Sequence, residues 1–315
     1  MNDIFSLLPG TIRALIENYP PDLMKDVEEI RIRIHRPLEL VIAGKPSYPK
    51  WNGEHYLVTE HDAEQLLNKL SDFSLYALEE ELRRGYITVR GGHRVGLAGR
   101  VTTDKGQVKA IKEIGSYNIR IARQKLGIVD PYIPFLHKNK TWLNTLIIGP
   151  PQTGKTTFLR DFARIISSGK SNLNIQPAKV GIVDERSEIA ACIKGVPQHD
   201  LGYRVDVLDA CPKAEGMMMM IRSMSPEVLV VDEIGRKEDS EALLEAMNAG
   251  IQMVMTIHAR GIEDLERRPM IKPLLDIGVF DRFIELSRKG EPGIVRRICS
   301  GDGKELYIKE KVRIV

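Results

Sequence analysis

Eight residues from Gly149 to Thr156, GPPQTGKT, fit the pattern G-x-x-x-x-G-K-[ST] of a phosphate-binding loop. The apolar stretch LIIG precedes them and the helical pattern TTFLRDFARIIS follows, as this motif requires. The glycines let the backbone curl so that its N–H groups and the helix N-terminus converge on phosphate oxygens. Lys155 would place its charge on the β and γ phosphates, and Thr156 would offer a hydroxyl ligand to Mg²⁺. The predicted ATP-binding residues are Gly149, Pro150, Pro151, Gln152, Thr153, Gly154, Lys155, Thr156 and Thr157.

Acidic side chains follow two other apolar runs. In VLVVDE, Asp232 and Glu233 come directly after a predicted strand, where an α/β sheet presents its ligand groups. We expect Asp232 to hold Mg²⁺ through water and Glu233 to orient and deprotonate an attacking water; the alternative is an acidic helix start. Asp184 and Glu185, in GIVDERSE, could join this water-positioning set, or they could belong to an ordinary turn capped by Asp184 or Ser187.

A histidine ends a further apolar run, in the stretch IQMVMTIHARG. Taken alone, His258 is more often a satisfied core or surface histidine than a residue that contacts a ligand. Its sequence neighbours do not decide between these interpretations, so its role depends on the order of the motifs around it.

The elements that must position these side chains are short apolar runs, TLIIG, VGIVD, VLVVDE and MVMTI, separated by longer helical segments. Such runs are typical of strands buried on both faces of a parallel sheet, which predicts an α/β domain over residues 140–315. The run from Met217 to Met220 would lie on one of its helices. There it could pack in the core or form an adaptable subunit surface.

Residues 1–130 show a different pattern, which predicts a smaller α+β domain. EIRIRIH alternates isoleucines with charged residues, the period of a half-buried strand. HDAEQLLNKLSDFSLYALEEELRRG carries leucines at helical spacings, and the short strands ITVR, HRVGLAGRV and SYNIRIAR follow it. The stretch GIVDPYIPFLHKNK has two prolines and little regular pattern, so we place the domain boundary between residues 127 and 140.

Composition limits the class of protein. The chain has 315 residues, of which 43% are hydrophobic and 28% charged, as in a soluble globular protein of two domains. No stretch approaches the roughly 20 apolar residues that span a bilayer, and the start, MNDIFSLLPG, has no basic leader, so we expect a cytoplasmic protein. The three cysteines are widely separated and form no CxxC pair, which argues against a disulfide framework or a structural zinc site.

Positive charge is concentrated in one segment. From Arg83 to Lys125 there are eleven lysines or arginines against Asp104 and Glu113. This segment could line the nucleotide cleft, bind an anionic membrane surface or acidic partner, bind nucleic acid, or pair with acidic side chains elsewhere. Tyr86 is one of only two aromatic residues in it, so the sequence does not indicate a base-stacking platform and disfavours nucleic acid.

The motifs LIIGPPQTGKTT, VDER, MIRSMSPEVLVVDEIG and AGIQMVMTIHARG, in this order, resemble the ATPases of type II and type IV secretion systems. In that family they correspond to the Walker A loop, the aspartate box, an arginine followed by the Walker B strand, and the histidine box. The resemblance covers residues 140–290, and SYNIRIAR is similar to the strand that ends the N-terminal domain of those ATPases. Pro151, Gln152 and Asp232 depart from the usual pattern. RIRIHRPLEL, RGGHRVGLAGRV and GPPQTGKTT further resemble a sporulation family of endospore-forming bacteria.

This resemblance implies a RecA-like P-loop ATPase that hydrolyses ATP to ADP and phosphate. Its catalytic residues would be Glu233, Lys155, His258 and Arg222. A histidine box implies that His258 lies near the γ phosphate and senses its loss through a hydrogen bond.

The resemblance also implies an assembly, a hexameric ring with ATP at the subunit boundaries. An arginine of a neighbouring subunit would then meet the developing charge on the γ phosphate. Arg222, Arg120 and Arg123 are the candidates, although each could instead be a solvated or salt-bridged surface residue. The ring would lie in the cytoplasm, peripherally on membrane channel subunits, and would energise a sporulation-specific secretion channel between mother cell and forespore. The alternatives are a nucleotide-dependent protein that binds single-stranded nucleic acid and a nucleotide-gated scaffold with little turnover.

Overall fold

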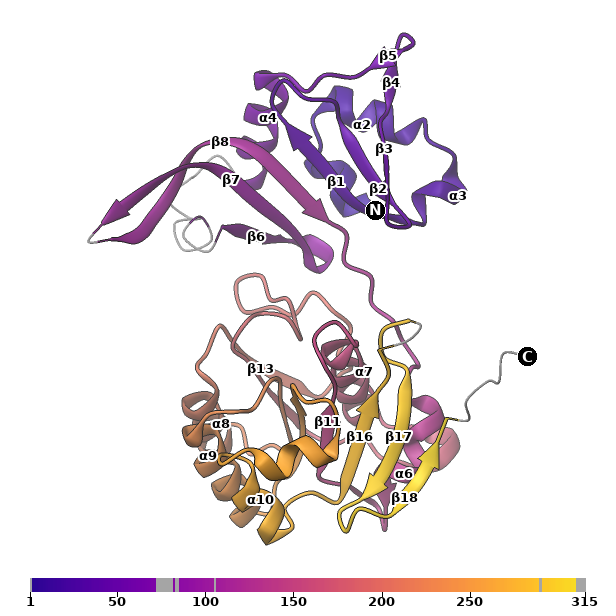
Figure 1. Ribbon diagram of the computed structural model, residues 1–315, viewed down its shortest axis with the longest axis vertical. Helices are drawn as coiled ribbons and strands as arrows, with labels where there is room; N and C mark the ends of the chain where they lie inside the picture. The colour runs from indigo at the N-terminus through magenta and orange to yellow at the C-terminus, as the bar shows by residue number, and fades with distance from the viewer. Residues whose placement is uncertain (1, 72–81, 83–84, 105, 289–290, 310–315) are drawn as a thin grey trace. The chain divides into compact units, whose positions relative to one another are not determined.

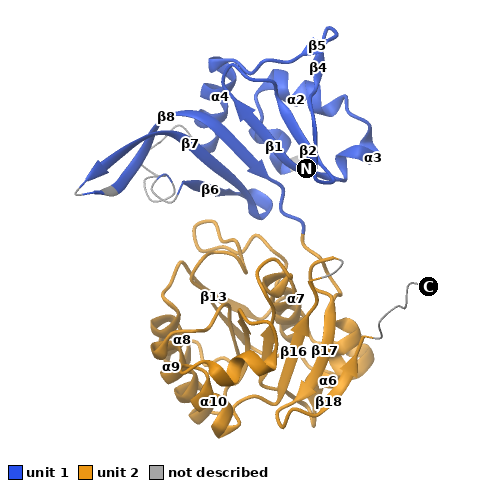
Figure 2. Ribbon diagram, in the orientation of Figure 1, with its two compact units in different colours: residues 1–123 blue, residues 124–315 orange. Residues whose placement is uncertain are grey.

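The structure, a computed structural model, describes residues 2–71, 82, 85–104, 106–288 and 291–309 (Figure 1). The chain divides into two compact units, Met1–Arg123 and Gln124–Val315 (Figure 2). The division lies just before residues 127–140, where the sequence analysis places the boundary. That stretch belongs to unit 2 because its apolar side chains, including Val129 and Leu136, are buried in the core of that unit.

Unit 1 contains a six-stranded antiparallel sheet in the order β3-β2-β1-β8-β7-β6. The strands are β1 (Val27–Arg33), β2 (Glu39–Ile42), β3 (Lys45–Ser47), β6 (Tyr86–Val89), β7 (His93–Asp104) and β8 (Gln107–Arg120), with a separate ribbon of β4 (Lys50–Trp51) and β5 (Glu54–His55). The helices are α1 (Asn2–Leu7), α2 (Gly10–Glu17), α3 (Pro21–Met24) and α4 (Glu60–Leu70), and a 3₁₀ turn, η2 (Arg90–Gly92), joins β6 to β7.

The alternation in EIRIRIH is confirmed by β1. Ile30 and Ile32 are buried in a core that also takes side chains from α1, α2 and α4. Arg31 and Arg33 form ion pairs at 2.7 and 2.8 Å with glutamates of β1 and β2. The leucine pattern is helical as far as Leu70, and its continuation over residues 72–81 and 83–84 lies outside the described residues.

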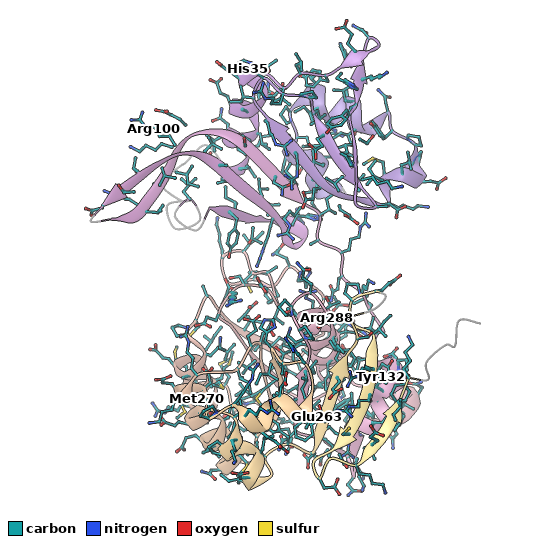
Figure 3. All side chains as sticks on the ribbon, in the orientation of Figure 1. His35, Arg100, Tyr132, Glu263, Met270 and Arg288 are labelled. Atoms are coloured by element: carbon teal, nitrogen blue, oxygen red, sulfur yellow. The ribbon has the colours of Figure 1, made fainter. Side chains whose placement is uncertain are left out.

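The predicted strands HRVGLAGRV and SYNIRIAR form a long hairpin, β7 and β8, which carries much of the basic segment (Figure 1). Arg100 lies on this hairpin (Figure 3). Tyr117, the second aromatic residue of the segment, is buried and cannot stack on a base. Several basic side chains pair with carboxylates, namely Arg90 with Asp3, Arg100 with Glu113, Arg120 with Glu29 and Lys125 with Glu291. Arg83, Arg84 and Lys105 lie outside the described residues.

Unit 2 contains an eight-stranded sheet in the order β13-β12-β14-β15-β11-β16-β17-β18. The strands are β11 (Thr145–Ile148), β12 (Val180–Asp184), β13 (Val205–Asp209), β14 (Val228–Val231), β15 (Gln252–Ile257), β16 (Arg282–Leu286), β17 (Val295–Ser300) and β18 (Glu305–Ile308), with a small ribbon of β9 (His137–Lys138) and β10 (Thr141–Trp142). The helices are α6 (Ile133–Leu136), α7 (Lys155–Ser168), α8 (Lys213–Ser223), α9 (Lys237–Asn248) and α10 (Lys272–Ile277), with 3₁₀ turns η3 (Asp130–Tyr132), η4 (Ser171–Leu173) and η5 (Ile262–Arg267).

The expected largely parallel sheet is confirmed. The runs TLIIG, VGIVD, VLVVDE and MVMTI are β11, β12, β14 and β15, which pair in parallel, while β17 and β18 add an antiparallel edge. α6 and α7 pack on one face of the sheet, and α8, α9 and α10 on the other. Because both faces are covered, these strands are predominantly apolar.

The methionine run lies on α8, as expected, and part of it packs in the core. Met217 and Met220 are buried against the sheet, whereas Met219 is 46% exposed. The three cysteines are unpaired. Among the helices of the described residues, none combines the length and apolar character needed to cross a bilayer.

Candidate functional site

The phosphate-binding motif connects β11 to α7, at the edge where the parallel strands have their carboxyl ends. Gly154 has φ 85°, and a Cβ there would collide with the backbone of Gly293, so only glycine fits. The Thr153 hydroxyl donates a hydrogen bond to the Pro150 carbonyl at 2.9 Å, and the Gly293 N–H donates to the Thr153 carbonyl at 2.8 Å. The loop is therefore held by the chain's own contacts, with α7 beginning directly after it. Pro151 and Gln152 form its exposed tip, and Thr157 lies in the first turn of α7.

Lys155 points back into this loop and is only 6% exposed. Its Nζ donates to the Pro150 carbonyl at 3.0 Å and lies 2.9 Å from Nδ1 of His258. Because an ammonium group has donors only, Nδ1 must accept, and the neutral imidazole then carries its proton on Nε2. Burial lowers the pKa of Lys155, and the nearby carboxylates of Asp232 and Glu233 oppose that shift.

Glu233 is held from two sides. Nε2 of His258 donates to Oε1, and Nη1 of Arg186 lies 2.8 Å from Oε2. The backbone of Glu233 is left-handed, with φ 54°, and its N–H donates to the Thr256 hydroxyl at 2.9 Å. His258 therefore joins Lys155 to Glu233, and both of its ring nitrogens have partners. Arg186 lies within VDER, but no local pattern distinguishes it from an ordinary surface arginine.

Asp232 joins the phosphate loop to β15, the strand that His258 follows. Its Oδ2 accepts a hydrogen bond from the Thr156 hydroxyl at 2.7 Å, and its Oδ1 accepts from the Thr256 hydroxyl. Thr256 is fully buried, and its only sequence signal is its place two residues before His258. A hydroxyl and a carboxylate side by side fit Mg²⁺, which prefers oxygen ligands and keeps several waters.

Asp184 and Glu185 are engaged in the turn that follows β12. The Asp184 carboxylate accepts hydrogen bonds at 2.8–2.9 Å from the backbone N–H groups of residues 188–190, the capping role. Glu185 forms ion pairs with Lys213 and, at 3.8 Å, with Arg236. Both carboxylates help to line a small hollow together with Asp232 and Glu233. Its other lining residues are Arg186, Glu188 and Lys213.

Burial, partly offset by the backbone N–H donors, raises the pKa of Asp184 from 3.8 to about 6. The folded chain then binds this proton at a higher pH than the unfolded chain, so the group's contribution to stability rises as the pH falls from 6 towards 3.8. Between pH 7 and pH 5 the gain is about 1 kcal/mol, or roughly 2–4 °C in the unfolding midpoint of unit 2. We therefore expect the midpoint of the wild type, measured relative to Asp184→Asn, to rise over this range in scanning calorimetry. A difference that stays constant or falls would contradict the shift.

The structure does not bring the candidate arginines to Glu233 within one unit. Arg222 lies in the last turn of α8, which leads into the amino end of β14, whereas Asp232 follows the carboxyl end of that strand. Arg120 and Arg123 belong to unit 1. There Arg120 lies 3.8 Å from Glu29, and Arg123 donates to the carbonyl of Val27 at 2.8 Å.

The chain is similar to known proteins over nearly its whole length. The family model described as sporulation stage III, protein AA, matches residues 1–306. Stage III sporulation protein AA of Bacillus subtilis (strain 168) is 56% identical over 306 residues, 97% of this chain and 97% of that protein. Among solved structures, the Legionella pneumophila ATPase DotB matches with a TM-score of 0.55 at 16% identity, covering 93% of this chain and 81% of that one. The pilus retraction motor PilT with bound ADP matches with a TM-score of 0.58 at 17% identity, covering 96% and 83%. At these identities the structural likeness shows the fold, which is the RecA-like fold expected from the sequence.

Proposed function

Because the chain belongs to the family of sporulation stage III protein AA, we propose that it is a sporulation ATPase that hydrolyses ATP to ADP and phosphate. The two solved structures that share its fold are described as an ATPase and as a motor with bound ADP. The observation that carries the proposal is the contact chain from Lys155 through His258 to Glu233, which joins the phosphate loop to a carboxylate at the end of β14.

Nucleotide binding would use the loop and the start of α7. The backbone N–H groups at this helix N-terminus attract phosphate oxygens, and Lys155 adds a charge that burial keeps out of water. Lys155 uses two of its three N–H donors in its contacts with Pro150 and His258, which leaves one for a phosphate oxygen. Any shift of Nζ towards the phosphate would change its contact with Nδ1 of His258. Thr156 and Asp232 would hold Mg²⁺, which when bound supplies positive charge to the β and γ phosphates.

Hydrolysis would use Glu233 as the general base. Its carboxylate accepts a proton from the water whose oxygen bonds to the γ phosphorus, while the bond from that phosphorus to the ADP oxygen breaks. His258 keeps Glu233 oriented through Nε2. If Lys155 then leaves Nδ1 of His258, that nitrogen, which carries no proton in this tautomer, would accept a hydrogen bond from a water beside the γ phosphate.

The proposal extends to assembly and place of action. We propose a hexameric ring in the cytoplasm, bound peripherally to membrane channel subunits, which energises a sporulation-specific channel between mother cell and forespore. Arg222 lies at the edge of the sheet opposite Asp232, so it could meet a γ phosphate only across a subunit boundary. Arg120 and Arg123 remain the other candidates for an arginine acting in trans.

The purified wild-type chain tests this function. We expect Mg²⁺-dependent release of phosphate from ATP, and light scattering should give the mass of a ring when a non-hydrolysable ATP analogue is present. ATP binding without phosphate release, at concentrations that form the ring, would replace the ATPase by a nucleotide-gated scaffold. That second candidate is favoured by one observation, that both carboxylate oxygens of Glu233 already have partners. Salt-dependent retention of single-stranded DNA without phosphate release would instead favour a nucleic-acid-binding protein.

A further inference from the structure

Arg186 contacts the carboxylate on which the proposed chemistry depends. Its Nη1 lies 2.8 Å from Oε2 of Glu233, while His258 donates to the other oxygen, Oε1. The Glu233 side chain is 22% exposed and that of Arg186 is 63% exposed, so the pair lies where the site opens to solvent. The two donors therefore hold the carboxylate at opposite oxygens.

Two-point contact matters because a glutamate side chain has several rotatable bonds. A carboxylate held at one oxygen can still turn about its terminal bond, whereas one held at both oxygens has a defined plane. The backbone of Glu233 is also constrained, by its left-handed φ and by the bond from its N–H to Thr256. With Arg186 in place, the carboxylate is fixed from the backbone to the oxygens that would accept the water's proton.

The turn that carries Arg186 is itself well anchored. Asp184, two residues earlier, accepts three backbone hydrogen bonds from residues 188–190. These bonds close a turn that contains Arg186. Glu185, the preceding residue, is tied to Lys213 of α8. Because the backbone of this turn is restrained, an arginine on it can hold its partner in one position. An arginine on a long free loop could not.

We propose that Arg186 is a positioning residue for Glu233, which sets the plane of the carboxylate for the attacking water without contacting the nucleotide. This inference rests on the proposed ATPase function. A surface ion pair with no such role would contribute little to stability and nothing to turnover. The positioning role predicts instead that loss of Arg186 lowers the rate of the chemical step and leaves nucleotide binding unchanged.

The test compares three variants with the wild type. Arg186→Ala should lower kcat for phosphate release about tenfold or more, while KM and the affinity for a fluorescent ADP analogue stay within about twofold. Arg186→Lys keeps a positive donor at this position and should recover part of kcat. Arg236→Ala is the matched control, because Arg236 is 71% exposed and lies 3.8 Å from the carboxylate of Glu185; it should leave kcat unchanged.

Each other outcome overturns the inference. An unchanged kcat in Arg186→Ala reduces the pair to an ordinary surface contact. A rise in KM with kcat unchanged would place Arg186 on the nucleotide, and an equal loss in Arg236→Ala would make the effect one of general surface charge. A wild type that binds nucleotide but releases no phosphate would remove the proposed function and this inference with it. Normal wild-type turnover with an unaffected Arg186→Ala would remove the inference alone.

Discussion

Replacing Lys155 with alanine is expected to abolish nucleotide binding. The ammonium group is the only cation that the structure, over its described residues, places inside the phosphate loop, and it is almost completely shielded from water. Charge-assisted hydrogen bonds contribute about 1.5–3 kcal/mol each, so losing contacts to two phosphates should weaken affinity by more than about 100-fold. Titration with a fluorescent, non-hydrolysable ATP analogue measures this loss directly.

A matched control separates this effect from a general loss of charge or stability. Lys170 follows the same helix, α7, and pairs with Asp130 at 2.8 Å at the protein surface. Lys170→Ala should therefore bind nucleotide as the wild type does. The unfolding midpoint of Lys155→Ala must also be measured, since the variant leaves the Pro150 carbonyl and Nδ1 of His258 without their donor. Wild-type affinity in a folded Lys155→Ala would show that the loop does not bind phosphate through this side chain.

The second large effect is expected from Glu233→Gln, which should bind ATP and fail to hydrolyse it. Glutamine keeps an oxygen that can accept the hydrogen bond from His258, but it cannot take a proton from water. Loss of a general base costs about 10²- to 10⁴-fold in rate, and phosphate release should fall by that factor. Nucleotide affinity should change little, because over the described residues the carboxylate of Glu233 reaches the phosphate loop only through His258, and the substitution leaves the backbone bond from Glu233 to Thr256 in place.

The control for Glu233→Gln is Glu241→Gln on α9. The Glu241 carboxylate pairs with Lys237 at 3.4 Å on the exposed surface of the helix. The rate of phosphate release by Glu241→Gln should therefore match that of the wild type. Undiminished phosphate release by Glu233→Gln would transfer the role of base to another group. Reduced ATP binding by the same variant would show that the amide disturbs the loop.

The local chemistry of this chain makes its parallel strands and phosphate loop predictable. In buried apolar runs such as the VLVV of VLVVDE, the backbone N–H and C=O groups find hydrogen-bond partners within a sheet that is covered on both faces. The glycines at fixed spacing determine the conformation of the phosphate loop. The carboxyl ends of parallel strands meet at one edge of the sheet, so the residues that follow them lie close together. These residues include Lys155, Thr156, Asp232 and Glu233.

The partners of these side chains were not predictable in the same way. Thr256 meets Asp232 because β14 and β15 pair with Val231 opposite Met255, a register that no local pattern encodes. Arg186 lies against Glu233 in a turn that Asp184 holds through its backbone hydrogen bonds, and these contacts form only in the folded chain. The length of the β7–β8 hairpin also exceeds the short strands expected, since cross-strand pairing continues beyond the apolar segments.

The contact between Gly293 and the phosphate loop ties the two ends of unit 2 together. Gly154 is separated from Gly293 by most of that unit, and yet the backbone at Gly293 leaves no room for a Cβ at Gly154. A shortened chain that stops after β16 would keep every residue of the nucleotide motifs and still lose the outer wall of the loop. The minimal fragment for expressing this site must therefore include the antiparallel edge strands, which a motif-based choice of boundaries would discard.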